Sequence, residues 1–128
     1  MRTAVIIPAF NEVDALPAVL ADLATHVPDH YVIVVDDGST DGTYLAAVDG
    51  GATCLRLPFN LGIGGALRLG FRHAVREGFD RAYQFDADRQ HDATQIAALL
   101  TALDDADMVI GSRFVDDGGY QVGRSRGV

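Results

Sequence analysis

Short, continuous apolar or β-branched runs alternate along this chain with segments of helical periodicity. The runs cover residues 4–7, 31–35, 53–57, 82–85 and 108–110. Runs without polar alternation are typical of strands that are covered on both faces. Strand–helix repeats of this length predict βαβ units with right-handed crossovers. We therefore predict an α/β fold, with a Rossmann-like, mostly parallel sheet flanked by helices, in one domain over residues 1–128.

Three segments between the runs predict amphipathic helices. In segments 16–23, 63–75 and 93–103, apolar residues recur at spacings of three and four. Asp92 is placed to cap the third helix, with Gln95 three residues later as in a capping box. A weaker helical pattern covers residues 43–48, and Gly78 is placed to end the second helix.

The acidic charge balance limits the possible ligands. The chain carries 10 Lys+Arg against 18 Asp+Glu, a formal net charge of −8 at pH 7. Such a field repels nucleic acid, and it also repels a free nucleotide diphosphate unless a cation arrives with it. We therefore expect no nucleic-acid partner.

The single cysteine, Cys54, excludes an internal disulfide and a cysteine zinc site, and we interpret it as a small buried hydrophobe. The sequence shows no signal peptide and no apolar stretch near the ~20 residues that span a bilayer. We expect a cytoplasmic protein, with peripheral contact at the inner face of a membrane left open.

Polar or glycine-rich patches follow four of the apolar runs, at residues 11–12, 36–41, 60–65 and 86–90. Open parallel sheets bind ligands outside the carboxyl ends of their strands. If the runs are parallel strands, the patches therefore converge on one crevice. Together they predict an enzyme that handles a nucleotide diphosphate.

The last patch has the composition of a metal site. Side chains alternate along an extended chain, so Asp86, Asp88 and Gln90 are expected to point the same way. Their oxygen atoms suit Mg²⁺ or Mn²⁺. The alternative is a solvated turn before the cap at Asp92. His91 adjoins the patch and stays a minor candidate.

The second and third patches suit contacts to a nucleoside. Asp36 leaves a buried strand and can accept a hydrogen bond from a base or a ribose, whereas Thr40 and Asp41 suit a helix cap. The role of Asp37 stays open. The glycines of residues 62–65 open a helix but fail the G-x-G-x-x-G pattern of dinucleotide sites, because Leu67 takes the third glycine position.

Two groups of arginines can be distinguished, one on a predicted helix and one near the end of the sequence. Arg68, Arg72 and Arg76 lie opposite an apolar stripe and predict a solvated helix face. Candidate phosphate contacts are Arg113, Arg124 and Arg126, because anions need positive partners. We expect three histidines to lie on the surface and to have no function: His26, His30 and His73.

Several motifs, in order, resemble family 2 glycosyltransferases with the GT-A fold. The first two lie at residues 5–12 and 34–43. Residues 60–65, 86–92 and 111–114 are similar to the subgroup of dolichol- or polyprenyl-phosphate mannose and glucose synthases. The resemblance covers residues 4 to about 114.

The resemblance implies inverting transfer of a hexose from a UDP- or GDP-sugar with Mg²⁺ or Mn²⁺. It implies donor contacts at Pro8, Phe10, Glu12, Asp36, Asn60, Gly62, Gly64, Asp86, Arg124 and Arg126. It also implies metal ligands at Asp86, Asp88 and Gln90, with Asp88 and Arg113 as the catalytic residues. For Phe10, a core position is the alternative. Arg89 departs from the subgroup, where a small residue is usual.

The expected acceptor is a polyprenyl phosphate, whose oxyanion is already a nucleophile and needs no general base. Chain length departs from the family, so we interpret the chain as the donor-binding, N-terminal part, with the acceptor-binding part absent. A saccharide hydroxyl as acceptor would need a base from that part, or less readily from Asp116 or Asp117. A non-catalytic nucleotide-binding module is the other alternative. Nucleotidyl transfer is disfavoured because residues 8–11 lack a glycine-rich basic loop.

Overall fold

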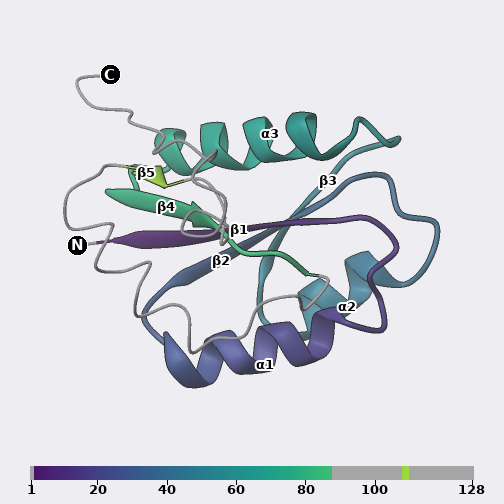
Figure 1. The fold of residues 1–128 in the computed structure, drawn as a ribbon, viewed down its shortest axis with the longest axis horizontal. Helices are drawn as coiled ribbons and strands as arrows, with labels where there is room; N and C mark the ends of the chain where they lie inside the picture. The colour runs from purple at the N-terminus through teal and green to yellow at the C-terminus, as the bar shows by residue number, and fades with distance from the viewer. Residues whose placement is uncertain (1, 88–107, 110–128) are drawn as a thin grey trace, which may run out of the picture.

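A parallel sheet forms the centre of the molecule (Figure 1). The computed structural model describes residues 2–87 and 108–109. In that part of the chain the sheet has five strands in the order β3-β2-β1-β4-β5, and each neighbouring pair is parallel. The strands are β1 (Thr3–Ala9), β2 (Tyr31–Asp36), β3 (Thr53–Arg56), β4 (Arg81–Gln84) and β5 (Met108–Val109). The predicted α/β fold is confirmed.

Helices cover both faces of the sheet. The first two, α1 (Leu16–His26) and α2 (Thr43–Asp49), lie on one face, and α3 (Ile63–Arg76) lies on the other (Figure 1). The chain moves from β1 outward to β3, and then crosses back through α3 to β4 on the other side of β1. The strand order thus reverses at β1, which is where open α/β sheets bind their ligands. The helix predicted at 93–103 lies outside the described residues.

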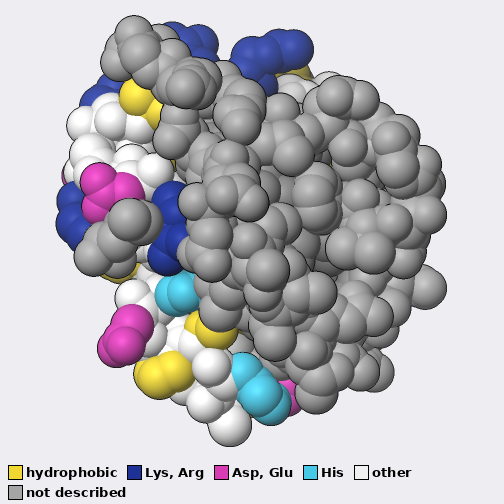
Figure 2. Space-filling view, turned by 60° about the vertical axis from the view of Figure 1, so that its left-hand side comes forward, with side chains coloured by type: hydrophobic (Ala, Val, Ile, Leu, Met, Phe, Trp, Pro, Cys, Tyr) yellow, Lys and Arg dark blue, Asp and Glu magenta, His cyan; other side chains and the backbone are white. Residues whose placement is uncertain are grey.

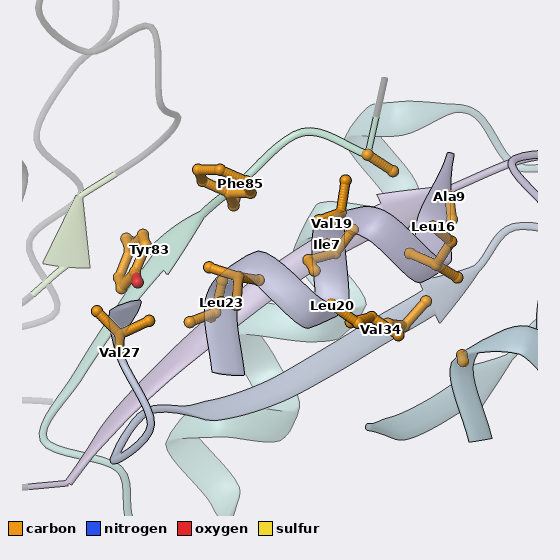
Figure 3. Packing of buried hydrophobic residues seen from close by; sticks show 13 residues of the cluster. Ile7, Ala9, Leu16, Val19, Leu20, Leu23, Val27, Val34, Tyr83 and Phe85 are labelled. Carbon is orange, nitrogen blue, oxygen red and sulfur yellow. The ribbon is translucent and has the colours of Figure 1, made fainter. Parts of the chain in front are cut away.

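Each face of the sheet has its own apolar core, as the continuous runs predict. Along β1, Val5 and Ile7 belong to one core, whereas Ala4 and Ile6 belong to the other. Figure 3 shows the first core, where β-strand side chains pack against α1. The α1 residues in it are Leu16, Val19, Leu20 and Leu23.

Small residues allow α3 to approach the sheet closely. Its buried residues are Ala66, Gly70 and Ala74. A Cβ at Gly70 would lie 2.4 Å from Ile6 Cγ2, so a larger residue would force the helix and sheet apart. The prediction that Gly78 ends the helix is confirmed, because α3 ends at Arg76 and Gly78 has φ +82°.

The outer side of α3 is basic. Arg68, Arg72 and Arg76 are exposed, as predicted for a solvated face. Figure 2 shows dark blue side chains along the top of the molecule, at the level of α3 in Figure 1. A shallow hollow of about 360 Å³ lies here, near the end of α3 that is remote from the carboxyl edge of the sheet. No helix in the described residues is long and apolar enough to cross a bilayer.

His30 is less exposed than predicted. It is half-buried, and its Nδ1 lies 2.9 Å from the hydroxyl oxygen of Tyr83, a buried residue of β4. Burial, together with the nearby charge of Arg81, lowers the pKa of His30. Cys54 is half-buried rather than fully buried, and burial raises its pKa to about 11. The His30–Tyr83 contact joins residues 53 positions apart, so no local pattern could indicate it.

Candidate functional site

A hollow of about 190 Å³ lies at the carboxyl ends of the central strands. The loops after β1, β2 and β3 all contribute to it, so the structure brings the first three polar patches together. The lining residues are Pro8, Ala9, Phe10, Glu12, Asp37, Asn60, Gly62 and Ile63. A similar hollow of about 210 Å³ lies near the start of β2, away from these loops.

Asp37 holds the loop between β3 and α3. Its carboxylate accepts the backbone N–H of Leu61 at 2.7 Å and that of Gly62 at 2.9 Å. The side-chain amide of Asn60 donates to the same carboxylate at 3.2 Å and to the Asp37 carbonyl oxygen at 3.1 Å. Asp37 itself is only 3% exposed, and its charge-assisted bonds to the loop are partly buried. The role of Asp37, left open by the sequence, is thus to anchor this loop.

The backbone of Gly38 packs closely against the same loop. It has φ +77°, and a Cβ built on it would lie 2.4 Å from the carbonyl carbon of Phe59. The backbone of the loop therefore rests directly on the backbone of Gly38, which no side chain would permit. Residues 37–38 and 59–62 form one packed unit.

A second set of hydrogen bonds joins the loops after β1 and β2. Asn11, with φ +54°, accepts the backbone N–H of Thr40 through its Oδ1 at 2.9 Å. In return, Ser39 Oγ accepts the backbone N–H of Asn11 at 2.8 Å. Thr43 Oγ1 accepts the N–H of Glu12 at 2.9 Å. These contacts fix the chain directly after Phe10.

The predicted cap at Thr40 or Asp41 is wrong, because the N-cap residue of α2 is Gly42 and no side chain makes a cap hydrogen bond there. Asp41 instead contacts the first helical residue from one position earlier. Asp41 Oδ1 accepts the backbone N–H of Thr43 at 2.9 Å and also contacts the Thr43 hydroxyl. The hydrogen bond from that hydroxyl lowers the pKa of Asp41. Thr40 is not a cap, because its backbone and its hydroxyl both donate to Asn11.

Asp36 is not among the residues that line the hollow. It is 1% exposed, and its Oδ1 accepts the N–H of Ser39 at 3.0 Å. Its Oδ2 lies 3.8 Å from Arg56 Nε, and it has no hydrogen-bond partner within the described residues. Arg56 in turn lies over the ring of Tyr44, 4.4 Å from the centroid. The base contact predicted for Asp36 stays a prediction.

Most of the predicted donor contacts near the ends of β1 and β3 lie together. Pro8, Phe10, Glu12, Asn60 and Gly62 all line the hollow. The core alternative for Phe10 is wrong, because the residue is 45% exposed and lines the hollow. Gly64 does not line it, although a Cβ there would meet nothing within 4 Å.

Asp86 is the one described member of the predicted metal trio. Its Oδ1 accepts a hydrogen bond from Gln84 Nε2 at 2.8 Å. A carboxylate at the carboxyl edge of the sheet is a hard oxygen donor, so it fits Mg²⁺ or Mn²⁺ as one ligand. Among the described residues, no group of three His, Cys, Asp or Glu could hold a metal ion. The predicted residues Asp88, Gln90, Arg113, Arg124 and Arg126 lie outside the described part of the chain, as do Arg89, His91, Asp116 and Asp117.

A family pattern and two relatives match most of this chain. The sequence pattern described as Glycosyl transferase family 2 matches residues 4–126. An undecaprenyl-phosphate mannosyltransferase from Micrococcus luteus is 42% identical over an alignment 123 residues long, which covers 92% of this chain and 51% of that protein. A polyprenol monophosphomannose synthase from Mycolicibacterium smegmatis is 37% identical over 91% of this chain and 47% of its own length. The chain thus spans about half the length of these relatives.

A solved structure is also similar. It is the glucosyl-3-phosphoglycerate synthase of Mycobacterium tuberculosis in complex with Mn²⁺, UDP and glucosyl-3-phosphoglycerate. It is 26% identical, has a TM-score of 0.65, and is matched over 80% of this chain and 39% of that one. This likeness agrees with the GT-A fold that the sequence predicts.

Proposed function

The chain belongs to glycosyl transferase family 2, and we propose that it forms the donor-binding part of an inverting hexosyltransferase. The donor is a nucleotide diphosphate sugar, and the acceptor is a polyprenyl phosphate. The observation that carries this proposal is the hollow at the carboxyl edge, built by three loops that hydrogen bonds and backbone packing hold in place.

The nucleoside occupies the hollow. Phe10 and Pro8 offer apolar surface to a base, and the Asn60 amide is held beside them by Asp37. Phosphate is disfavoured here, because the N–H groups of Leu61 and Gly62 already donate to the Asp37 carboxylate. The volume of about 190 Å³ is also below the roughly 300–1,000 Å³ of a pocket for a whole drug-sized ligand. The sugar and diphosphate therefore extend past it.

The diphosphate lies on the side of β4, near Asp86. We propose that Asp86, Asp88 and Gln90 hold Mg²⁺ or Mn²⁺, which when bound neutralises charge on the departing diphosphate. The Mn²⁺ and UDP of the solved mycobacterial synthase support this assignment. Arg113, with Arg124 and Arg126, supplies positive charge to donor or acceptor phosphate.

The acceptor assignment rests on the relatives. Their names specify undecaprenyl phosphate and polyprenol monophosphomannose. A phosphate oxyanion attacks without a general base, so the task of the protein is to place donor and acceptor in line. A lipid acceptor also places the enzyme at the cytoplasmic face of a membrane.

Calorimetric titration of this chain with UDP and with GDP, with and without Mn²⁺, tests the donor assignment. We expect at least one nucleotide to bind, and to bind more tightly with Mn²⁺. A hexose-transfer assay with a polyprenyl phosphate and with a saccharide then separates the two acceptors. If neither UDP nor GDP binds to the chain, the proposal is contradicted. If a nucleotide binds but a full-length relative that carries this segment transfers no hexose, the chain is better explained as a nucleotide-binding module.

A further inference from the structure

Gln84 is a buried polar residue whose presence the core does not explain. It is 2% exposed and pairs across the sheet with Ile6, which belongs to the aliphatic core under α3. Its carbonyl oxygen Oε1 is buried and has no hydrogen-bond partner within the described residues. An unpaired buried carbonyl destabilises a fold, and an aliphatic side chain would avoid that cost.

The amide group of Gln84 is nonetheless used. Nε2 donates to Asp86 Oδ1 at 2.8 Å, and the two residues lie on the same side of the chain because they are two positions apart. The reverse orientation of the amide would place two oxygen atoms at this distance. The Asp86 carboxylate therefore determines which way the Gln84 amide is turned, and the buried amide in turn holds the carboxylate in its orientation.

We propose that Gln84 is a positioning residue that holds the Asp86 carboxylate in the orientation used to bind the donor and its cation. This inference rests on the proposed function, because it assigns to Asp86 a contact with the metal or the ribose. Polar groups buried at a cost to stability are expected where a site must be preorganised. Gln84 acts only through Asp86 and touches no substrate itself.

The test compares two buried polar residues that are neighbours in β4. Gln84→Met keeps the length of the side chain and removes the donor, whereas Tyr83→Phe removes the hydroxyl that meets His30 on the opposite face of the same strand. For Gln84→Met we expect the affinity for UDP or GDP with Mn²⁺ to fall about tenfold or more, as is common when the partner of a metal ligand is lost. Its thermal midpoint should be unchanged or higher. For Tyr83→Phe we expect the reverse, a lower midpoint and the same affinity.

Gln84→Leu replaces Gln84→Met if the latter does not fold. Wild-type affinity in a folded Gln84 variant would overturn the inference, and so would an equal loss of affinity in Tyr83→Phe. Failure of the wild-type chain to bind either nucleotide would instead contradict the proposed function, so the two failures are distinguishable.

Discussion

Replacing Asp37 by Asn tests whether its carboxylate holds the loop that lines the hollow. The variant keeps the shape of the side chain but exchanges one oxygen for an NH₂ group. That group cannot accept from Leu61 or Gly62, whose N–H groups now reach the two carboxylate oxygens at 2.7 and 2.9 Å. At least one of these partly buried N–H groups would therefore face another donor.

The expected loss of stability follows from these contacts. Leaving a fully buried donor unsatisfied costs about 1–3 kcal/mol and a partly buried one costs less, and the remaining hydrogen bond also loses its charge assistance. We therefore expect the free energy of unfolding to fall by about 1–3 kcal/mol. Urea denaturation measures this change, and hydrogen exchange at the amides of Leu61 and Gly62 shows whether the loop is the part that loosens.

Asp49→Asn is the matched control, because it removes the same charge from an exposed position at the end of α2. Its free energy of unfolding should stay within about 0.5 kcal/mol of wild type. A loss in Asp37→Asn no larger than in this control, with unchanged exchange at residues 61 and 62, would refute the anchoring role.

Three further predictions follow from the packing and the titrating groups. Gly70→Ala should destabilise the fold by about 1–3 kcal/mol in urea denaturation, because its Cβ would overlap Ile6; wild-type stability would contradict the close helix–sheet contact. Phe10→Ala should weaken nucleotide binding by about 1–3 kcal/mol in calorimetry if the ring stacks on the base, and unchanged affinity would exclude stacking. Because folding lowers the pKa of His30, the unfolded chain binds the proton of this imidazole more tightly than the folded chain does. The folded state is therefore favoured above the unfolded pKa of about 6.5, and this contribution to stability is lost as the pH falls below that value. Denaturation between about pH 7.5 and pH 5.5 should show this loss, and His30→Gln should reduce it; an equal slope in the variant would assign the loss to other groups.

The fold could be predicted because its signals are local. Continuous apolar runs and helical stripes can be recognised without knowledge of distant contacts. A strand that is apolar on both faces must be covered on both sides, which favours a sheet between two layers of helices. Strand ends were less certain, since β1 continues through Ala9 and β3 stops at Arg56. Both differences are of one or two residues, where the end of a strand depends on its neighbour.

The roles of Asp36 and Asp37 show why the site was harder to predict. Adjacent residues at the end of a strand point to opposite faces, so a shift of one residue exchanges them. The structure places Asp37 in the lining of the hollow and Asp36 beside Arg56. The anchoring bonds join residues 23 to 25 positions apart, and only the folded chain brings them together. A signal was present, because the N–H groups of a glycine-rich loop need acceptors and Asp37 was the carboxylate without an assigned role.

The dependence of nucleotide affinity on Mn²⁺, compared between wild type and Asp88→Asn, tests the central claim most directly. We predict that Mn²⁺ tightens the binding of UDP or GDP to the wild-type chain and to the Asp49→Asn control. In Asp88→Asn this gain should disappear while the thermal midpoint stays nearly constant. An undiminished Mn²⁺ effect in a folded Asp88→Asn protein would contradict the claim that this edge of the sheet binds a nucleotide diphosphate through a cation.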